Sequence, residues 1–202
     1  MSTIAEVYVI DTETTGLDGY PVDVIVDIGV SKVNFVKETV EDVYSSMVGY
    51  DISTWSEERQ HAWIFENTDL TLIDVFNAPR PNTVINDLLP ILFGRYVTAF
   101  NTGYDLVKFL YHSPWNFNTL FAEVTDIMKA AVPVCKVPRA TGVGYKFPKL
   151  QEAYDIITAG DPAGINGKQD HRALSDTRVA GHVMLQMFKN GDYVPKVVPR
   201  VV

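Results

Sequence analysis

The sequence predicts an α/β fold in which a mixed five-stranded sheet is flanked by helices. Two observations lead to this prediction. Runs of strand length rich in Val and Ile dominate the N-terminal part of the chain, and after about residue 80 helical patterns alternate with short apolar runs. Strands that come first, followed by alternating helices and strands, are typical of mixed sheets with helices on their faces.

Five segments have the composition and length of strands: residues 6–11, 22–35, 39–48, 95–101 and 119–124. The second shows the pattern most clearly, because its apolar residues between Val24 and Val30 recur at every second position and so lie on one face. The first ends in Asp11, which places a carboxylate at the end of a buried strand.

Helical periodicity marks several other segments. After Pro81, apolar residues recur at intervals of three and four until Gly94, which predicts a helix between them. The other predicted helices span residues 103–112, 126–131, 149–157 and 172–189. Asp126 is expected to cap the second of these, and clustered Pro and Gly predict loops over 133–148 and 160–167.

The length of 202 residues and the hydrophobic content of 47% suit one domain with a sizeable core. We expect residues 1–190 to form this domain and residues 191–202 to be an extended C-terminal tail. No stretch approaches the ~18–20 consecutive apolar residues that cross a bilayer, and the N-terminus does not resemble a signal peptide. The sequence therefore predicts an intracellular, cytoplasmic protein without a membrane partner.

The net charge of −8 argues at first against a nucleic-acid partner, but its distribution weakens that argument. Residues 37–74 contain nine acids and two basic residues, a net charge of −7. Residues 129–149 contain five basic residues and no acid. This basic segment would contact phosphates of a strand, unless it is an ordinary solvated loop.

Five residues from three stretches have the chemistry of a metal-dependent phosphodiester hydrolase. The stretches are Asp-Thr-Glu-Thr-Thr-Gly-Leu at 11–17, Asn-Thr-Gly-Tyr-Asp at 101–105 and His-Arg-Ala-Leu-Ser-Asp at 171–176. Carboxylate oxygens suit hard cations such as Mg²⁺ or Mn²⁺, and a histidine can take a proton from a metal-bound water. The candidate residues are Asp11, Glu13, Asp105, His171 and Asp176.

The positions of the acids support this hypothesis to different degrees. In an extended chain Asp11 and Glu13 point the same way, so they would repel each other unless a cation lies between them. Asp105 lies in the first turn of its predicted helix, where the positive helix N-terminus alone would explain an acid.

The last predicted helix gives a stronger indication. Asp176 precedes Ala180 by four residues and Val183 by seven, so it lies on the buried stripe of this helix. Burial of an unpaired carboxylate costs several kcal/mol or more, on the order of other desolvation penalties for charged groups. Asp176 therefore needs a partner, and a metal ion is a natural one. His171 is expected on the loop just before this helix.

The three stretches, in this order, resemble the motifs of the DnaQ-like 3′→5′ exonucleases, in the branch with a histidine in its third motif. This family includes the proofreading epsilon subunit of the bacterial replicative polymerase, RNase T and oligoribonuclease. The resemblance covers roughly residues 6–188, including a helix and turn over 69–79, and implies an RNase H-like fold. Phe100, where the family often has His, and Asp27, where it usually has Glu, depart from the pattern.

The resemblance implies a role for each candidate residue. Asp11 would bridge two Mg²⁺ or Mn²⁺ ions that Glu13, Asp105 and Asp176 also hold, and His171 would act as the general base. Such a site would hydrolyse phosphodiester bonds at the 3′ end of nucleic acid and release nucleoside 5′-monophosphates. We expect single-stranded DNA to be favoured over RNA.

The resemblance also implies substrate contacts. The residues concerned are Thr12, Thr14, Leu17, Asn101 and Tyr104. Leu17 would pack against the terminal base, unless it is an ordinary core leucine. Because the chain shows no polymerase domain, a proofreading role would need a separate DNA polymerase as partner, and a second copy of the chain is another candidate partner.

Three alternatives stay open at this point. In the first, the substrate is RNA or short oligoribonucleotides, because no residue decides between DNA and RNA. In the second, the chain is a non-catalytic nucleic-acid-binding module with the same fold. In the third, it is a metallohydrolase of small phosphoesters, for which a closed pocket is expected instead of an open groove.

Overall fold

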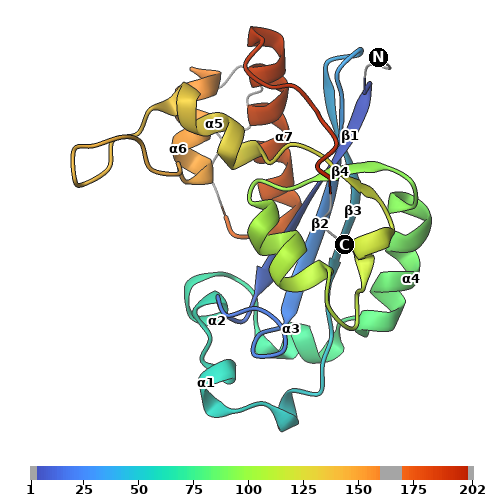
Figure 1. The fold of residues 1–202 in the computed structure, drawn as a ribbon. Coiled ribbons are helices and arrows are strands. Elements are labelled where there is room, and N and C mark those ends of the chain that lie inside the picture. The colour runs from blue at the N-terminus through green and yellow to red at the C-terminus, as the bar shows by residue number, and fades with distance from the viewer. Residues whose placement is uncertain (1–3, 160–169, 200–202) are drawn as a thin grey trace.

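A computed structural model describes residues 4–159 and 170–199 of the chain (Figure 1). Its centre is a five-stranded sheet with the strand order β3-β2-β1-β4-β5. The strands are β1 (Glu6–Thr14), β2 (Ile25–Asn34), β3 (Thr39–Met47), β4 (Tyr96–Thr98) and β5 (Ala122–Glu123). β1, β2 and β3 pair antiparallel, whereas β4 pairs parallel with β1 and β5 parallel with β4. The predicted mixed five-stranded sheet is confirmed.

Helices cover both faces of this sheet (Figure 1). One face carries α5 (Ile127–Cys135), α6 (Leu150–Thr158) and α7 (Ala173–Asn190), and the other carries α4 (Pro81–Leu92) and the π-helix η2 (Gly103–Leu110). Successive side chains of a strand point to opposite faces. Val7 and Val9 of β1 therefore join the core under α7, whereas Ile10 joins the core under α4.

The segment between β3 and α4 forms short helices, most of which the sequence patterns did not predict. They are η1 (Ile52–Thr54), α1 (Glu57–Gln60), α2 (Trp63–Asn67) and α3 (Leu72–Asn77), of which only α3 overlaps the helix and turn expected over 69–79. They enclose a small apolar cluster that includes Trp55, Ile64 and Val75. This segment lies at the bottom of Figure 1, near the carboxyl end of β1.

α5 is longer than the sequence predicts. The predicted helix stops at Ala131 because Pro133 disfavours a helix interior, but the helix continues to Cys135. Ala131 and Cys135 are both buried in the core under α7, and this packing outweighs the proline. The predicted cap is confirmed, since Asp126 Oδ1 accepts the amide hydrogen of Lys129 at 2.7 Å.

The other predicted elements are present with shifted ends. The helix expected over 103–112 is a π-helix, in which the amide of Tyr111 donates to the carbonyl of Leu106 at 2.8 Å. The predicted loop over 160–167 lies outside the described residues. No helix within 4–159 or 170–199 is long and apolar enough to span a membrane.

The residues after α7 pack against the edge of the sheet. Tyr193 is buried, and its hydroxyl donates to the carbonyl of Thr125 at 2.7 Å. Further along, the amide of Val198 donates to the carbonyl of Glu123 in β5 at 2.9 Å. The predicted tail therefore runs along β5 as far as it is described.

Candidate active site

The carboxyl end of β1 carries two acids on the face that α7 covers. Asp11 and Glu13 follow Val7 and Val9 at the two-residue period of a strand, so they point to the same side. The paired residues of β4 reach only as far as Val9. β4 thus ends before the two acids. Beside them, the edge of β1 is free of β4 and is contacted by η2 instead.

η2 brings Asp105 to this edge. The amide and the hydroxyl of Thr12 both donate to Asp105 Oδ1, at 3.0 and 2.8 Å. Just before η2, the carbonyl of Asn101 accepts the amides of Tyr104 and Asp105 at 2.9 and 3.1 Å. The first two stretches identified in the sequence are therefore joined through Thr12, whose hydroxyl holds an acid in place.

α7 supplies Asp176 from above the sheet. The start of α7 lies directly on β2, because a side-chain carbon at Gly29 would come within 2.4 Å of the Leu174 amide nitrogen. Asp176 is only 1% exposed, as its place on the apolar stripe of the helix predicts. The close contact at Gly29 is what brings this acid down to the level of Asp11 and Glu13.

His171 lies immediately before α7, as predicted. Its backbone is in the left-handed region with a φ of 56°. Its ring lies 5.0 Å from that of Trp63 in α2, in an edge-to-face arrangement. Ligand atoms of Glu13, His171 and Asp176 all lie within 4.8 Å of one another. One metal ion would span such a group.

Burial raises the pKa values of three of these acids, and for Asp11 and Glu13 the charges of neighbouring carboxylates raise them further. Burial raises the pKa of Asp11 well above its usual value, and the charges of the other three acids, Asp105 foremost, raise it further. Burial and then the charge of Asp176 raise the pKa of Glu13 to about 8. Burial raises the pKa of Asp105 to about 7, although hydrogen bonds from Thr12 oppose the shift. All four acids are therefore close enough to repel.

This set of donors fits a divalent cation. Mg²⁺ and Mn²⁺ prefer carboxylate oxygens, and a positive charge among the four acids would offset the repulsion that raises the pKa values of Asp11 and Glu13. The structure thus contains a group that can hold a metal ion. Two ions, and Mg²⁺ or Mn²⁺ as their identity, stay predictions.

Of the predicted substrate contacts, Thr12 and Thr14 lie in β1 and Leu17 on the loop that leaves it, whereas Asn101 lies just before η2 and Tyr104 within it. Leu17 is 74% exposed, so its interpretation as a core leucine is wrong. The hydroxyls of Thr14 and Tyr104 each donate to the carbonyl of Gly16 at 2.8 Å, and the ammonium of Lys108 donates to that of Leu17 at 2.6 Å. These bonds hold the loop that presents Leu17, and contacts with substrate stay predictions.

Two features of the site were not predicted from the sequence. Trp63 is 56% exposed beside His171, but it lies in a short helix without clear periodicity. Asp27 on β2 was noted only as a departure from the family, yet it lies opposite Glu13 and bonds to Arg172, next to His171. An acid within the apolar run between Val24 and Val30 is the signal that would have found Asp27.

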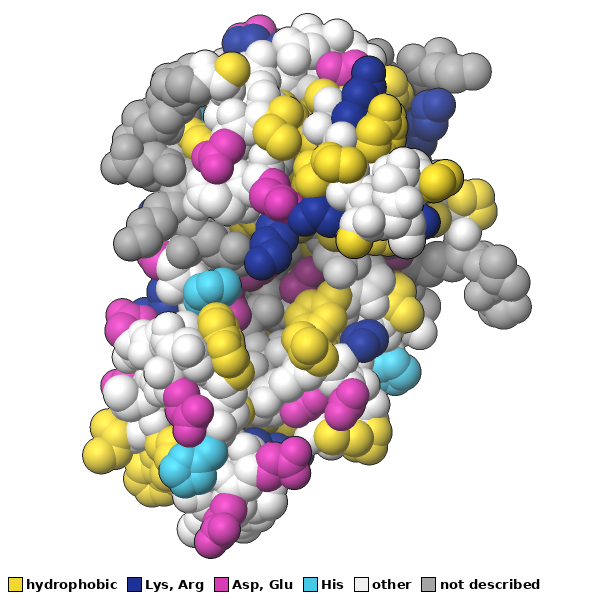
Figure 2. Space-filling model, turned by 90° about the vertical axis from the view of Figure 1, so that its left-hand side faces the viewer, with side chains coloured by type: hydrophobic (Ala, Val, Ile, Leu, Met, Phe, Trp, Pro, Cys, Tyr) yellow, Lys and Arg dark blue, Asp and Glu magenta, His cyan; other side chains and the backbone are white. Residues whose placement is uncertain are grey.

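The basic segment over 129–149 is partly occupied by internal ion pairs. Lys146 pairs with Glu152 at 2.8 Å, and Lys129 lies 3.7 Å from Asp126. Figure 2 shows a hollow across one face of the molecule, with acidic side chains inside it and hydrophobic and histidine side chains at its rim. Lys and Arg side chains gather beside this hollow.

The structure thus combines a mixed sheet of the RNase H-like type with acids from three chain segments that meet at the end of the central strand, beside a histidine, where a metal ion could be held. The chain belongs to the exonuclease family, because the RNase_T family model, described as an exonuclease, matches residues 8–184. The resemblance to DnaQ-like exonucleases is therefore confirmed.

Solved structures show the same fold. The chain is 18% identical to the nuclease domain of 3′hExo, a DEDDh family member bound to rAMP, with a TM-score of 0.71 and coverage of 99% of both chains. A 3′-exonuclease described with a histone mRNA stem-loop is 18% identical to this chain, with a TM-score of 0.69 and coverage of 98% of this chain and 87% of that one. E. coli Exonuclease I in complex with an oligonucleotide is 12% identical to this chain, with a TM-score of 0.63 and coverage of 92% of this chain and 41% of that one.

The chain spans 63% of the length of a full-length 3′-exonuclease with the same fold, at 19% identity, a TM-score of 0.69 and 96% coverage of this chain. No match among curated proteins was found.

Proposed function

We propose that this chain is a metal-dependent 3′→5′ exonuclease that shortens single-stranded nucleic acid and releases nucleoside 5′-monophosphates. The observation that carries the proposal is the meeting of four carboxylates from β1, η2 and α7, with His171 beside Glu13 and Asp176. Membership of the exonuclease family and the open hollow in Figure 2 support it, because a polymer end needs an open groove.

The acids would hold the metal, and the chain's other groups would hold the substrate. Asp11, Glu13, Asp105 and Asp176 are the metal-binding candidates, in a site for two divalent ions. When bound, the ions would polarise the scissile phosphate and stabilise the charge on the leaving oxygen.

His171 would act as the general base. It lies next to two of the acids and at the edge of the site, half-buried, so its ring can reach a water that approaches the phosphate. The left-handed backbone turn at this residue and the contact with Trp63 fix the direction of the ring. A proton taken from the attacking water would leave through the exposed edge of the imidazole.

Exposed apolar side chains would hold the terminal base. Leu17 follows β1 on one side of the acids, and Trp63 lies beside His171 on α2. Apolar contact and stacking tolerate any base, because every base has an apolar face. The enzyme would therefore degrade ends of any sequence.

DNA is the substrate that we favour, in keeping with the expectation from the sequence. RNA is the second candidate, because two proteins of the same fold are described with rAMP and with an mRNA stem-loop. A DNA polymerase or a second copy of the chain as partner, and a cytoplasmic location, also stay proposals.

The test is a degradation assay with matched substrates. Single-stranded DNA and RNA of one sequence, labelled at the 5′ end, are incubated with the protein and Mg²⁺ or Mn²⁺, with and without EDTA. We expect a ladder that shortens from the 3′ end, nucleoside 5′-monophosphates as products, and a faster rate on DNA.

The same assay discriminates among the alternatives. Faster shortening of RNA would replace DNA as the substrate, and activity that survives EDTA would contradict the metal site. If neither polymer is shortened but a small phosphoester is hydrolysed, the exonuclease proposal is wrong. Binding of the labelled strands without any hydrolysis would indicate a non-catalytic module.

A further inference from the structure

The first turns of α7 rest on three alternate residues of β2, which we call the docking seam: Asp27, Gly29 and Ser31. All three point to the α7 face, because they are two residues apart. Gly29 leaves room for the helix backbone, and the hydroxyls of Ser31 and Thr177 lie 2.6 Å apart. The docking seam therefore sets how α7 sits on the sheet.

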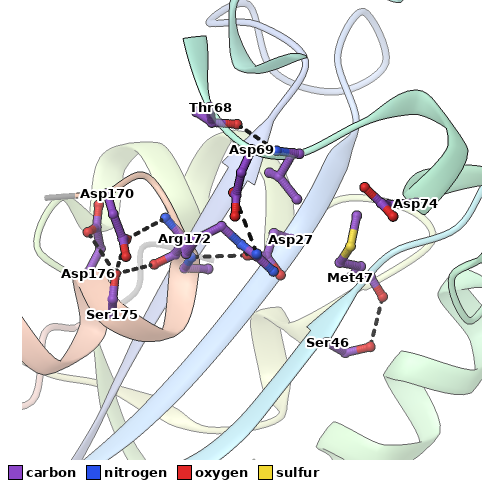
Figure 3. Close-up of polar contacts among 12 residues, drawn as sticks. Asp27, Ser46, Met47, Thr68, Asp69, Asp74, Asp170, Arg172, Ser175 and Asp176 are labelled. Carbon is purple, nitrogen blue, oxygen red and sulfur yellow. Dashed lines mark hydrogen bonds and ion pairs between the residues drawn. The ribbon is translucent and has the colours of Figure 1, made fainter. Parts of the chain in front are cut away.

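Asp27 is the polar anchor of this seam (Figure 3). Its Oδ2 accepts hydrogen bonds from Arg172 Nε at 3.0 Å and from the Ala173 amide at 3.2 Å. Arg172 also reaches Asp69, in the segment between α2 and α3, at 3.7 Å. Asp27 is 1% exposed, so the end of this ion pair that lies on the sheet is shielded from solvent.

Both ends of the pair adjoin candidate active-site residues. Arg172 directly follows His171 and precedes Asp176 by one helical turn, and Asp27 lies opposite Glu13 in the register of β1 and β2. Asp170 strengthens the turn around Arg172, because its Oδ1 accepts the Arg172 amide at 3.1 Å and the Ser175 hydroxyl (Figure 3).

A role in stability alone would not explain this arrangement. Buried ion pairs are weak contributors to stability, because desolvation offsets their attraction. Asp27 Oδ1 has no hydrogen-bond partner among the described residues, and the Asp27 charge adds to the repulsion on Glu13. An apolar pair would avoid both costs, but it would not fix the direction of the turn that carries His171.

We propose that Asp27 and Arg172 are positioning residues, whose ion pair holds His171 and Asp176 at the correct distance from Glu13. The inference rests on the proposed function for its effect on catalysis, but its effect on metal affinity does not depend on activity. Neither residue would contact the substrate or the metal.

The experiment compares Asp27→Asn and Arg172→Gln with a matched control on the same helix. Arg178 forms an ion pair with Asp42 of β3 through two bonds of 2.7 and 2.6 Å, so Arg178→Gln removes a helix-to-sheet ion pair that includes none of the candidate site residues. Each protein is measured well below its melting temperature for Mn²⁺ affinity by calorimetry, and for kcat and KM on the labelled strand.

We expect Mn²⁺ affinity and kcat to fall about 10- to 100-fold in Asp27→Asn and Arg172→Gln, as for other groups that orient metal ligands. KM should change little, and Arg178→Gln should match the unchanged protein. Arg172→Lys, which keeps the charge but loses the fixed direction of Nε, should show an intermediate loss. Arg172→Lys also provides the test if Asp27→Asn and Arg172→Gln do not fold.

The opposite result is equally clear. If these variants melt at lower temperature but keep the Mn²⁺ affinity and kcat of the unchanged protein, the pair is structural and the inference is wrong. If the unchanged protein degrades no strand, the proposed function fails, whereas the Mn²⁺ comparison still decides whether Asp27 and Arg172 position the site.

Discussion

The two faces of the sheet use alternate residues of the same strands in opposite ways. On the face under α4, β2 presents Ile28 and Val30, which are completely buried in an apolar core. On the face under α7, the adjacent parts of β1 and β2 present Asp11, Glu13 and Asp27. Apolar burial stabilises a fold, whereas crowded carboxylates destabilise it. At this end of the sheet, one face therefore supports the fold and the other holds a charged site, although the rest of the α7 face is apolar as well.

Removal of one acid should abolish most of the activity without lowering the stability of the fold, and this is the largest of the expected effects. Asp176→Asn is expected to lower the rate of 3′ shortening by a factor on the order of 10³ or more, as when one member of a catalytic unit is removed. Without metal its melting temperature should not fall, because one of the repelling charges is gone. Assays of rate and thermal melting in EDTA check both; a variant with a tenth of the normal rate would contradict the assignment.

Truncation on the apolar face should have the opposite result. Leu88 of α4 is fully buried in the core under that helix, and Leu88→Ala should lower the free energy of unfolding by about 2–5 kcal/mol. Activity per folded molecule should stay within about twofold of normal. Urea unfolding and the rate assay measure the two effects, and a large loss of activity in fully folded protein would show that the faces are not independent.

The stability of the protein should depend on pH through the carboxyl groups of the charged face. An acid with a raised pKa binds more protons in the folded than in the unfolded state between its two pKa values, so stability falls as pH rises through that interval. For Glu13 the interval runs from 4.5 to about 8.

In EDTA, the melting temperature should therefore fall from about pH 5 to about pH 8, and less so in Glu13→Gln. Mn²⁺ should raise it more at the higher pH, because the metal binds the deprotonated acids. A melting temperature that rises with pH in EDTA would contradict the repulsion.

The smallest effect is expected at the rim. Trp63→Ala should raise KM about fivefold, near the lower end of the contribution of base stacking, and Trp63→Phe should restore most of the loss. Phe93, which is 74% exposed after α4, provides the control, since Phe93→Ala removes an exposed aromatic ring elsewhere. Equal KM values in the two alanine variants would exclude a substrate contact at Trp63.

Much of the fold could be predicted because each strand and helix has its own local signal. The two-residue period in β2 and the three-to-four-residue period in α4 and α7 are properties of the sequence. Most of the short helices between β3 and α4 were missed, because three to five residues are too few to show a period. α5 passed Pro133 because core packing overrode a local preference.

The candidate site divides in the same way. The sequence by itself determined which acids and which histidine to consider, since their types, order and place in the elements are local facts. Only the tertiary structure decided that Asp105 is held by Thr12, that Trp63 lies against His171 and that Asp27 anchors the start of α7. Contacts between segments far apart in the chain depend on how strands register and helices dock, and no local pattern encodes those distances.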